Sequence, residues 1–102
     1  MPISMTVLYP TEGGTTFDHD YYASTHMGLV GEHFGPHMIS ATASKGLAGG
    51  SGTPPGFHAV ANIVFEDQGK LDAAMAAGGP VLADIPNYFN GQPQILIGEV
   101  IG

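Results

Sequence analysis

One amphipathic segment with strong start and stop signals constrains this chain more than any other. It runs from Phe17 to Pro36. Asp18 suits an N-cap, because its carboxylate can accept a hydrogen bond from an otherwise unpaired amide of the first turn. The Gly35-Pro36 pair ends the segment, since proline disfavours helix at the residue before it and has no amide donor. The sequence therefore predicts one helix between Asp18 and Gly35.

The apolar stripe of this helix carries side chains that packing alone does not require. At ~100° per residue, six positions fall on one face: Tyr22, His26, Leu29, Val30, His33 and Phe34. The face predicted to meet the core thus holds a phenol and two imidazoles among its apolar groups. Apolar packing needs no imidazole, so this stripe is the first place to look for chemistry.

The rest of the chain reads as strands, one further helix and loops. Alternating or apolar runs predict strands at residues 3–9, 37–45, 57–65 and 94–101. The small residues of 37–45 also permit a helix. Asp67 can cap a second helix that reaches Ala77, and a short helical turn is expected within 80–89. The glycine-rich stretch 46–56 is a loop.

This order, strand–helix–strand–strand–helix–strand, predicts an α+β fold of one domain over residues 1–102. It is the ferredoxin-like βαββαβ plan, in which two helices cover one face of a four-stranded antiparallel sheet. Strands 57–65 and 94–101 carry apolar side chains on both faces, which an open sheet face does not favour. Only 11% of the residues are charged, against ~25% in typical domains. We therefore expect a homodimer that packs sheet against sheet.

Charge and composition exclude several classes of function. The formal net charge is −7 and the only cations are Lys45 and Lys70. Nucleic acids and anionic membranes need a basic surface, so a small, neutral and mostly apolar molecule is the expected partner. The chain has no cysteine, which excludes disulfides, thiol nucleophiles and cysteine-bound clusters. No signal-peptide pattern or membrane-spanning run is present, and a cytoplasmic location is expected.

His26 is the best catalytic candidate on the stripe. An imidazole with an ordinary pKa of ~6.5 can take and return a proton near neutral pH, and general acid–base catalysis supplies ~10²–10⁴-fold. Tyr22, one turn earlier, could orient this ring or polarise a carbonyl group. The alternative is a core histidine that binds a backbone carbonyl.

Five further residues are candidates for lining a substrate cleft: His58, His33, Tyr88, Phe89 and Asp84. His33 can instead pack near the helix end. His58 begins a strand, and alternation does not settle which face it points to. Asp84 is favoured as a cap of a short helix.

A metal site and a nucleotide site are the other possibilities. His33 and His37 are four residues apart, with Glu32 adjacent, a spacing that can chelate zinc on an intact helix. Gly35-Pro36 lies between the two histidines and separates their faces. A metal site in which His26, His33 and His58 come together in the folded chain remains a possibility. The glycines of 46–56 match no phosphate or dinucleotide motif, so no metal or other cofactor is expected.

The sequence resembles the EthD family along nearly its whole length. The helix reads Phe17-Asp-x-Asp-Tyr-Tyr-x-x-x-His26-Met-x-Leu-Val30. Other runs that carry the resemblance are Val7-Leu-Tyr-Pro10, Lys45-Gly-Leu-Ala-Gly49, Pro54-Pro-x-x-His58-Ala59, Asp84-Ile-Pro-Asn-Tyr88 and Ile97-x-Glu99-Val100. The chain departs from the family at Gly28, where proline is common, and at His37, where a small or apolar residue is expected.

The resemblance implies a dimeric α+β barrel, with the ligand between the helices and the sheet of each subunit. The family is named after ethyl tert-butyl ether degradation, where the protein accompanies a cytochrome P450 system. The wider superfamily includes cofactor-free monooxygenases, polyketide cyclases, lactone isomerases and haem-degrading enzymes.

Three functions follow as expectations. The first is a cofactor-independent enzyme of oxidoreductase, isomerase or cyclase type, acting on a small apolar carbonyl, phenolic or lactone compound with His26 as base. The second is a small-molecule-binding accessory protein of an oxidative pathway, without chemistry of its own. The third is metal or haem binding.

Overall fold

Four antiparallel strands form one sheet in the order β2-β3-β1-β4. In this computed structural model, which describes residues 1–102, the strands are β1 (Ile3–Pro10), β2 (Met38–Lys45), β3 (Phe57–Phe65) and β4 (Gln94–Glu99). The predicted ferredoxin-like α+β fold is confirmed. The last strand ends at Glu99 instead of residue 101, and 37–45 is a strand, not a helix.

The predicted first helix is continuous but contains one wider turn. It consists of α1 (His19–Tyr21), a π-helical turn (Tyr22–His26) and α2 (Met27–Phe34). Asp18 is the N-cap and accepts from the Tyr21 amide at 3.0 Å, as predicted. The predicted second helix is α3 (Gln68–Ala77), and Asp67 caps it. The turn expected within 80–89 divides into α4 (Gly79–Ala83) and a 3₁₀ turn, Ile85–Asn87. No helix has the length and apolar content needed to cross a membrane.

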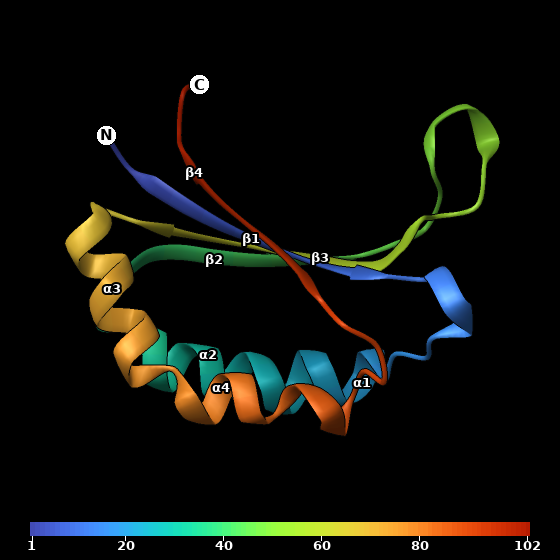
Figure 1. Cartoon of the computed structure of the whole chain (residues 1–102), viewed down its shortest axis with the longest axis horizontal. Coiled ribbons are helices and arrows are strands. Elements are labelled where there is room, and N and C mark those ends of the chain that lie inside the picture. Colours follow the sequence, from blue (N-terminus) through green and yellow to red (C-terminus); the bar gives the residue numbers. More distant parts are fainter.

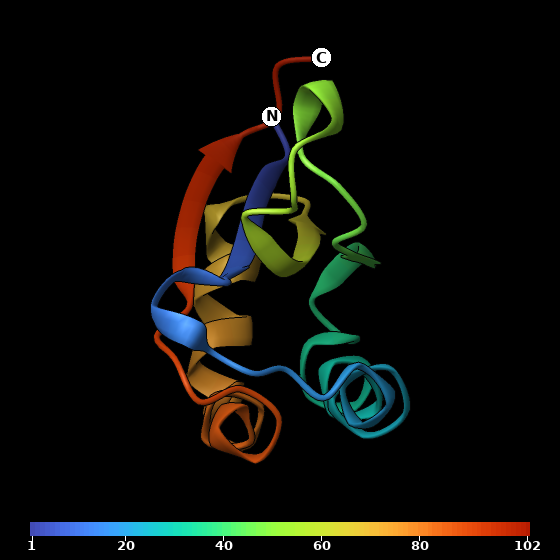
Figure 2. The same cartoon turned by 90° about the vertical axis from the view of Figure 1, so that its right-hand side faces the viewer.

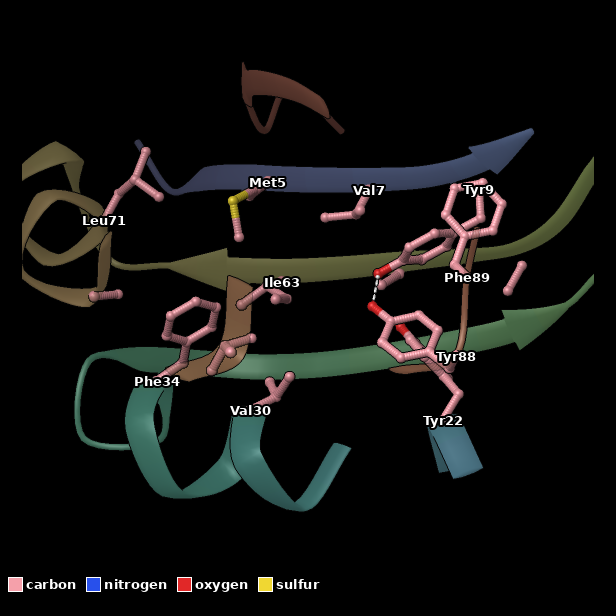
Figure 3. Close-up of a cluster of buried hydrophobic side chains, with 14 of the residues drawn as sticks. Met5, Val7, Tyr9, Tyr22, Val30, Phe34, Ile63, Leu71, Tyr88 and Phe89 are labelled. Atoms are coloured by element: carbon pink, nitrogen blue, oxygen red, sulfur yellow. Dashed lines mark hydrogen bonds between the residues drawn. The ribbon is translucent and has the colours of Figure 1, made fainter. Parts of the chain in front are cut away.

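The helices α1 to α4 all lie on one face of the sheet (Figure 1). Figure 2 shows α2 and α4 nearly end-on, next to each other beneath the strands. Side chains of Met5, Val7 and Ile63 point from the sheet into the layer between strands and helices (Figure 3). There they meet Val30 and Phe34 of α2, so the core sits between the two layers.

The other face of the sheet is left open and is partly apolar. Met5, Val7 and Tyr9 point toward the helices, so alternation places Leu8 on the opposite face. Its partner across the ladder is Val60, and Thr6 of the same face pairs with Leu96. Leu96 is 64% exposed. An apolar row on an uncovered sheet face indicates a surface that another chain can cover.

Replacement of Gly78 by Ala is expected to destabilise the protein by about 1–3 kcal/mol, because overpacking displaces core side chains. A Cβ at Gly78 would lie 2.5 Å from Cε1 and 3.0 Å from Cζ of Phe34, a ring that is 1% exposed. The matched control is Gly79→Ala, where a Cβ meets no atom within 4 Å. Urea denaturation of both variants checks this, and equal stabilities would show that the Phe34 ring moves aside freely.

Candidate functional site

A π-helical turn aligns the first two polar residues of the site. The Met27 amide bonds to the carbonyl of Tyr22, five residues back, and this wider turn brings positions four apart almost above one another. The rings of Tyr22 and His26 stack with centroids 5.1 Å apart and planes 22° apart. Both residues are buried, at 5% and 3% exposure. Pi-helical turns occur frequently at functional sites.

A buried carboxylate holds the imidazole of His26. Oδ2 of Asp84 lies 3.0 Å from Nδ1 of His26. An ionised carboxylate only accepts hydrogen bonds, so the hydrogen sits on Nδ1 and the ring donates. Oδ1 of Asp84 accepts from the Tyr21 hydroxyl at 2.6 Å and from Nδ2 of Asn87 at 2.9 Å. Three donors therefore fix the carboxylate, and the carboxylate fixes the ring and its tautomer.

A chain of hydroxyl groups continues from the other ring nitrogen. Nε2 of His26 lies 3.3 Å from the hydroxyl of Tyr88, and that hydroxyl lies 2.8 Å from the hydroxyl of Tyr9. With hydrogen on Nδ1, Nε2 is the acceptor and Tyr88 donates to it. Tyr9 in turn donates to Tyr88, the bond drawn in Figure 3. The result is a continuous hydrogen-bonded path from Asp84 through His26 to the sheet.

The surroundings favour a neutral imidazole beside an ionised carboxylate. Burial lowers the pKa of His26 below its ordinary 6.5, although the nearby Asp84 carboxylate acts in the opposite direction. Burial alone would raise the pKa of Asp84, but the hydrogen bonds from Tyr21, Asn87 and His26 lower it below 3.8. Burial raises the pKa values of Tyr9, Tyr22 and Tyr88, so these phenols keep their protons. His26 is thus a neutral base with hydrogen-bond donors around it.

His26 faces a small apolar cavity between the helices and the sheet. The cavity has a volume of about 30 Å³, enough for one or two water molecules. Apart from His26, its walls are aliphatic, aromatic or methionine side chains. Leu82 of α4 and Ile95 of β4, which are 41% and 48% exposed, lie at its border. A larger guest requires these walls to move.

The structure brings only some of the predicted residues together. Asp84 and Tyr88 contact His26 directly. Asp84 stands at the N-cap of the 3₁₀ turn Ile85–Asn87, as expected, but its side chain makes no capping bond there and binds His26 instead. Phe89 packs on Tyr9, with ring centroids 5.3 Å apart, and does not line the cavity.

His58 lies near the site but outside the cavity walls. Across the β1–β3 ladder Tyr9 pairs with Ala59 and Pro10 with Phe57, so His58 is the extra residue of a bulge. Its ring stacks on Phe17 at 5.8 Å, and its Nε2 lies 3.0 Å from Oγ1 of Thr15. The bulge breaks the alternation, which is why the sequence could not settle its direction.

His33 is half-buried on the flank of α2 and does not line the cavity. The buried residues of this helix recur at every fourth position, at Tyr22, His26, Val30 and Phe34, so its buried face passes beside His33. No three His, Asp or Glu side chains converge as a metal site requires. The combinations of His33 with His37 and Glu32, or with His26 and His58, are therefore not assembled.

Three residues of the network had not been singled out from the sequence: Tyr9, Tyr21 and Asn87. Each lies within a run that carries the family resemblance. Tyr21 directly precedes Tyr22, and Asn87 lies between Asp84 and Tyr88. Their position within these motif runs was the only sign in the sequence that they belong to the site. Local sequence patterns do not reveal which side chains meet across the fold.

Stability is expected to fall as the pH drops from ~7.5 to ~5.5, because folded His26 resists the proton that the unfolded chain accepts. Its folded pKa lies below 6.5, so the loss begins near 6.5 and continues down to the folded value. One proton gives at most ~1.4 kcal/mol per pH unit. The ionised Asp84 carboxylate also stabilises the fold; this stabilisation is fully present above pH 3.8 and is lost as the pH falls below that value. Urea denaturation at both pH values should show a weaker dependence in His26→Gln; equal dependence in both proteins would contradict the assignment.

Comparison with known proteins gives one family and several similar structures. The EthD domain model matches residues 15–91. A solved EthD-like protein from Ralstonia eutropha JMP134 is 38% identical, with a TM-score of 0.89, over 99% of this chain and 93% of that one. Among curated protein sequences, none matches this chain significantly.

More distant structures share the fold. A dimeric ferredoxin-like protein of unknown function from Thermobifida fusca YX is 11% identical, with a TM-score of 0.65, over 98% of this chain and 92% of that one. SnoaB, a cofactor-independent oxygenase from Streptomyces nogalater, is 12% identical, with a TM-score of 0.65, over 99% and 94%. At such identities the likeness concerns the fold alone.

Proposed function

This chain belongs to the EthD family, and from that premise we propose that it binds a small, mostly apolar compound beside His26 and moves a proton on it. The observation that carries the proposal is the Asp84–His26–Tyr88 network at the wall of an apolar cavity. A purely structural histidine needs neither a carboxylate held by three donors nor a neighbouring cavity. The substrate class is a carbonyl, phenolic or lactone compound.

The chemistry begins with proton abstraction. The Tyr88 hydroxyl hydrogen, which Nε2 accepts at rest, first turns away and frees the lone pair. Nε2 of neutral His26 then takes a proton from a C–H or O–H group of the substrate, and the electron pair stays on the substrate. The imidazolium is stabilised because Nδ1 donates to Asp84 and because the Tyr88 hydroxyl can turn to accept from Nε2. In an isomerase or cyclase the proton returns to another substrate atom. In an oxygenase, molecular oxygen would react with the substrate anion.

Tyr22 fits the role of an electrophilic partner. Its hydroxyl lies beside that of Tyr9 but forms no hydrogen bond as close as those of Tyr9, Tyr21 and Tyr88. Burial raises its pKa, so it remains a donor at neutral pH. A donor beside the base can stabilise charge that develops on a substrate oxygen.

The proposal includes a homodimer in which the open sheet faces pack together. The apolar row Leu8, Val60 and Leu96 on that face supports it, as does the dimeric ferredoxin-like protein from Thermobifida fusca. The cytoplasmic location expected from the sequence remains a prediction.

Deuterium exchange tests the proton transfer even when the final product is unidentified. A panel of small ketones, lactones and phenols is incubated with the protein in D₂O, and the loss of C–H signals is followed by NMR. Exchange should fall by about 10²–10⁴-fold in His26→Ala and persist in His33→Ala, the control on the same helix. A folded His26→Ala variant with unchanged exchange would rule out His26 as the base.

A carrier without chemistry is the second candidate, and the apolar lining of the cavity favours it. Here the network would orient a ligand through hydrogen bonds only. Compounds that shift the NMR signals of cavity residues but exchange no deuterium, in wild type and His26→Gln alike, would support this function over catalysis.

A further inference from the structure

A second depression lies on the other flank of the first helix, between that helix and the edge strand β2. Its helix wall includes Tyr22, Ala23 and Met27, and its sheet wall includes Ala43 and Ala59. Its volume is about 420 Å³, against about 30 Å³ for the cavity at His26. Pockets for small molecules have volumes of ~300–1,000 Å³, so this groove has the size that the inner cavity lacks.

Small side chains keep this groove open. Strand β2 reads Met-Ile-Ser-Ala-Thr-Ala-Ser-Lys from Met38 to Lys45, and Lys45 is the only large side chain of the strand in the groove lining, beside Ala43 and Ser44. Ala59 of β3 is 2% exposed and forms part of the floor, while Ala43 is exposed. The apolar floor is therefore accessible from the edge of the sheet.

The groove and the inner cavity share two residues, Tyr22 and Met27. Tyr22 is 5% exposed, and its hydroxyl lies beside that of Tyr9 without a close hydrogen bond. No fully inaccessible side-chain nitrogen or oxygen lacks a partner, so this hydroxyl is not completely sealed from its surroundings. Met27 is unbranched and adapts its shape easily. The two side chains between the groove and the inner cavity are thus a tyrosine with a hydroxyl group and a flexible methionine.

The charges at the rim favour a neutral occupant. Lys45 and Asp20 both line the groove, so an anion or a cation would meet a like charge on one side. Lys45 forms no salt bridge and is left as a free donor. The net charge of −7 also disfavours anions. An apolar body with an ether, ester or ketone oxygen fits these surroundings.

We propose that this groove is the docking chamber for a neutral, mostly apolar, oxygen-bearing compound, one end of which passes Tyr22 and Met27 to reach His26. The inference rests on the proposed function for its last step only. Docking itself depends on the alanine floor and on the Tyr22 hydroxyl. The inner cavity then needs to admit only the reacting end of the molecule.

Fluorescence titration with Nile red, a neutral apolar dye with a carbonyl group, tests the chamber. Ala43→Phe fills the groove from an exposed position and should weaken dye binding by about tenfold or more, since aromatic bulk removes the space for the dye. Ala23→Leu fills the groove from its helix wall and should also weaken dye binding. Ala73→Phe, on an exposed position of α3, is the matched control and should bind as wild type does.

Absence of dye binding by the wild type would overturn the proposal, and so would equal binding by Ala43→Phe, Ala23→Leu and the control. Tyr22→Phe should weaken binding by about 3–10-fold, the value of one hydrogen bond. Dye binding needs no proton transfer, so these outcomes are independent of whether His26 acts as a base. If the wild-type protein binds the dye but catalyses no deuterium exchange on the substrate panel, the catalytic function is rejected and the docking groove is still supported.

Discussion

Replacement of Asp84 by Ala is expected to destabilise the protein by about 1–3 kcal/mol, the cost of leaving a buried hydrogen-bond donor without an acceptor. The carboxylate is 7% exposed and accepts from His26, Tyr21 and Asn87 at 3.0, 2.6 and 2.9 Å. Its removal leaves Nδ1–H of His26 buried without an acceptor. Tyr21 and Asn87 lie closer to solvent and can turn to water, so most of the cost comes from His26.

Two matched variants show whether this loss comes from the network. Asp84→Asn keeps an acceptor oxygen for His26 but loses the charge, and should cost less than Asp84→Ala, by about 1 kcal/mol. Asp72→Ala removes an exposed acid of α3 and should change stability by less than ~0.5 kcal/mol. Urea denaturation at neutral pH measures all three. A loss of under ~1 kcal/mol in Asp84→Ala would mean that the carboxylate does not hold the ring.

The second large effect is expected on assembly: Leu96→Glu should convert the proposed dimer into a monomer. Leu96 is 64% exposed in one subunit, so the change does little to the fold of that subunit. On the sheet face that we propose as the interface, each copy would bury an unpaired carboxylate, at a cost of several kcal/mol per ion. The dimer dissociation constant should therefore rise by about 100-fold or more.

Analytical ultracentrifugation at micromolar concentrations measures this change. Ala73→Glu adds the same charge on the helix layer, at an exposed position of α3, and should leave the dimer intact. A dimer that persists in Leu96→Glu would place the interface elsewhere, and a wild-type monomer would reject the dimer itself.

The sequence was sufficient for the fold because its signals are local. Asp18 and Gly35-Pro36 mark the ends of the first helix, Asp67 marks the start of α3, and β3 matches the predicted run 57–65. Each of these depends on neighbours in the chain. The π-helical turn could not be predicted, since its hydrogen bonds differ from those of an α-helix by one residue.

The site was predictable only in part because its key contact is not local. His26 and Asp84 are 58 residues apart, and they meet because α4 packs beside α2. Periodicity indicated that His26 points inward, and its 3% exposure agrees. It could not indicate which group holds the ring. The bulge at His58 shows the same limit, since one extra residue changes the direction of a side chain.

Whether His26 is a neutral base is tested most directly by ¹⁵N NMR of its ring in the labelled wild-type protein, with His26→Gln to identify its signals. We expect a neutral ring at neutral pH, with hydrogen on Nδ1, no hydrogen on Nε2 and a pKa below 6.5. A ring with hydrogen on Nε2, or one that is already an imidazolium at neutral pH, would contradict this expectation, because neither form leaves a base to face the cavity.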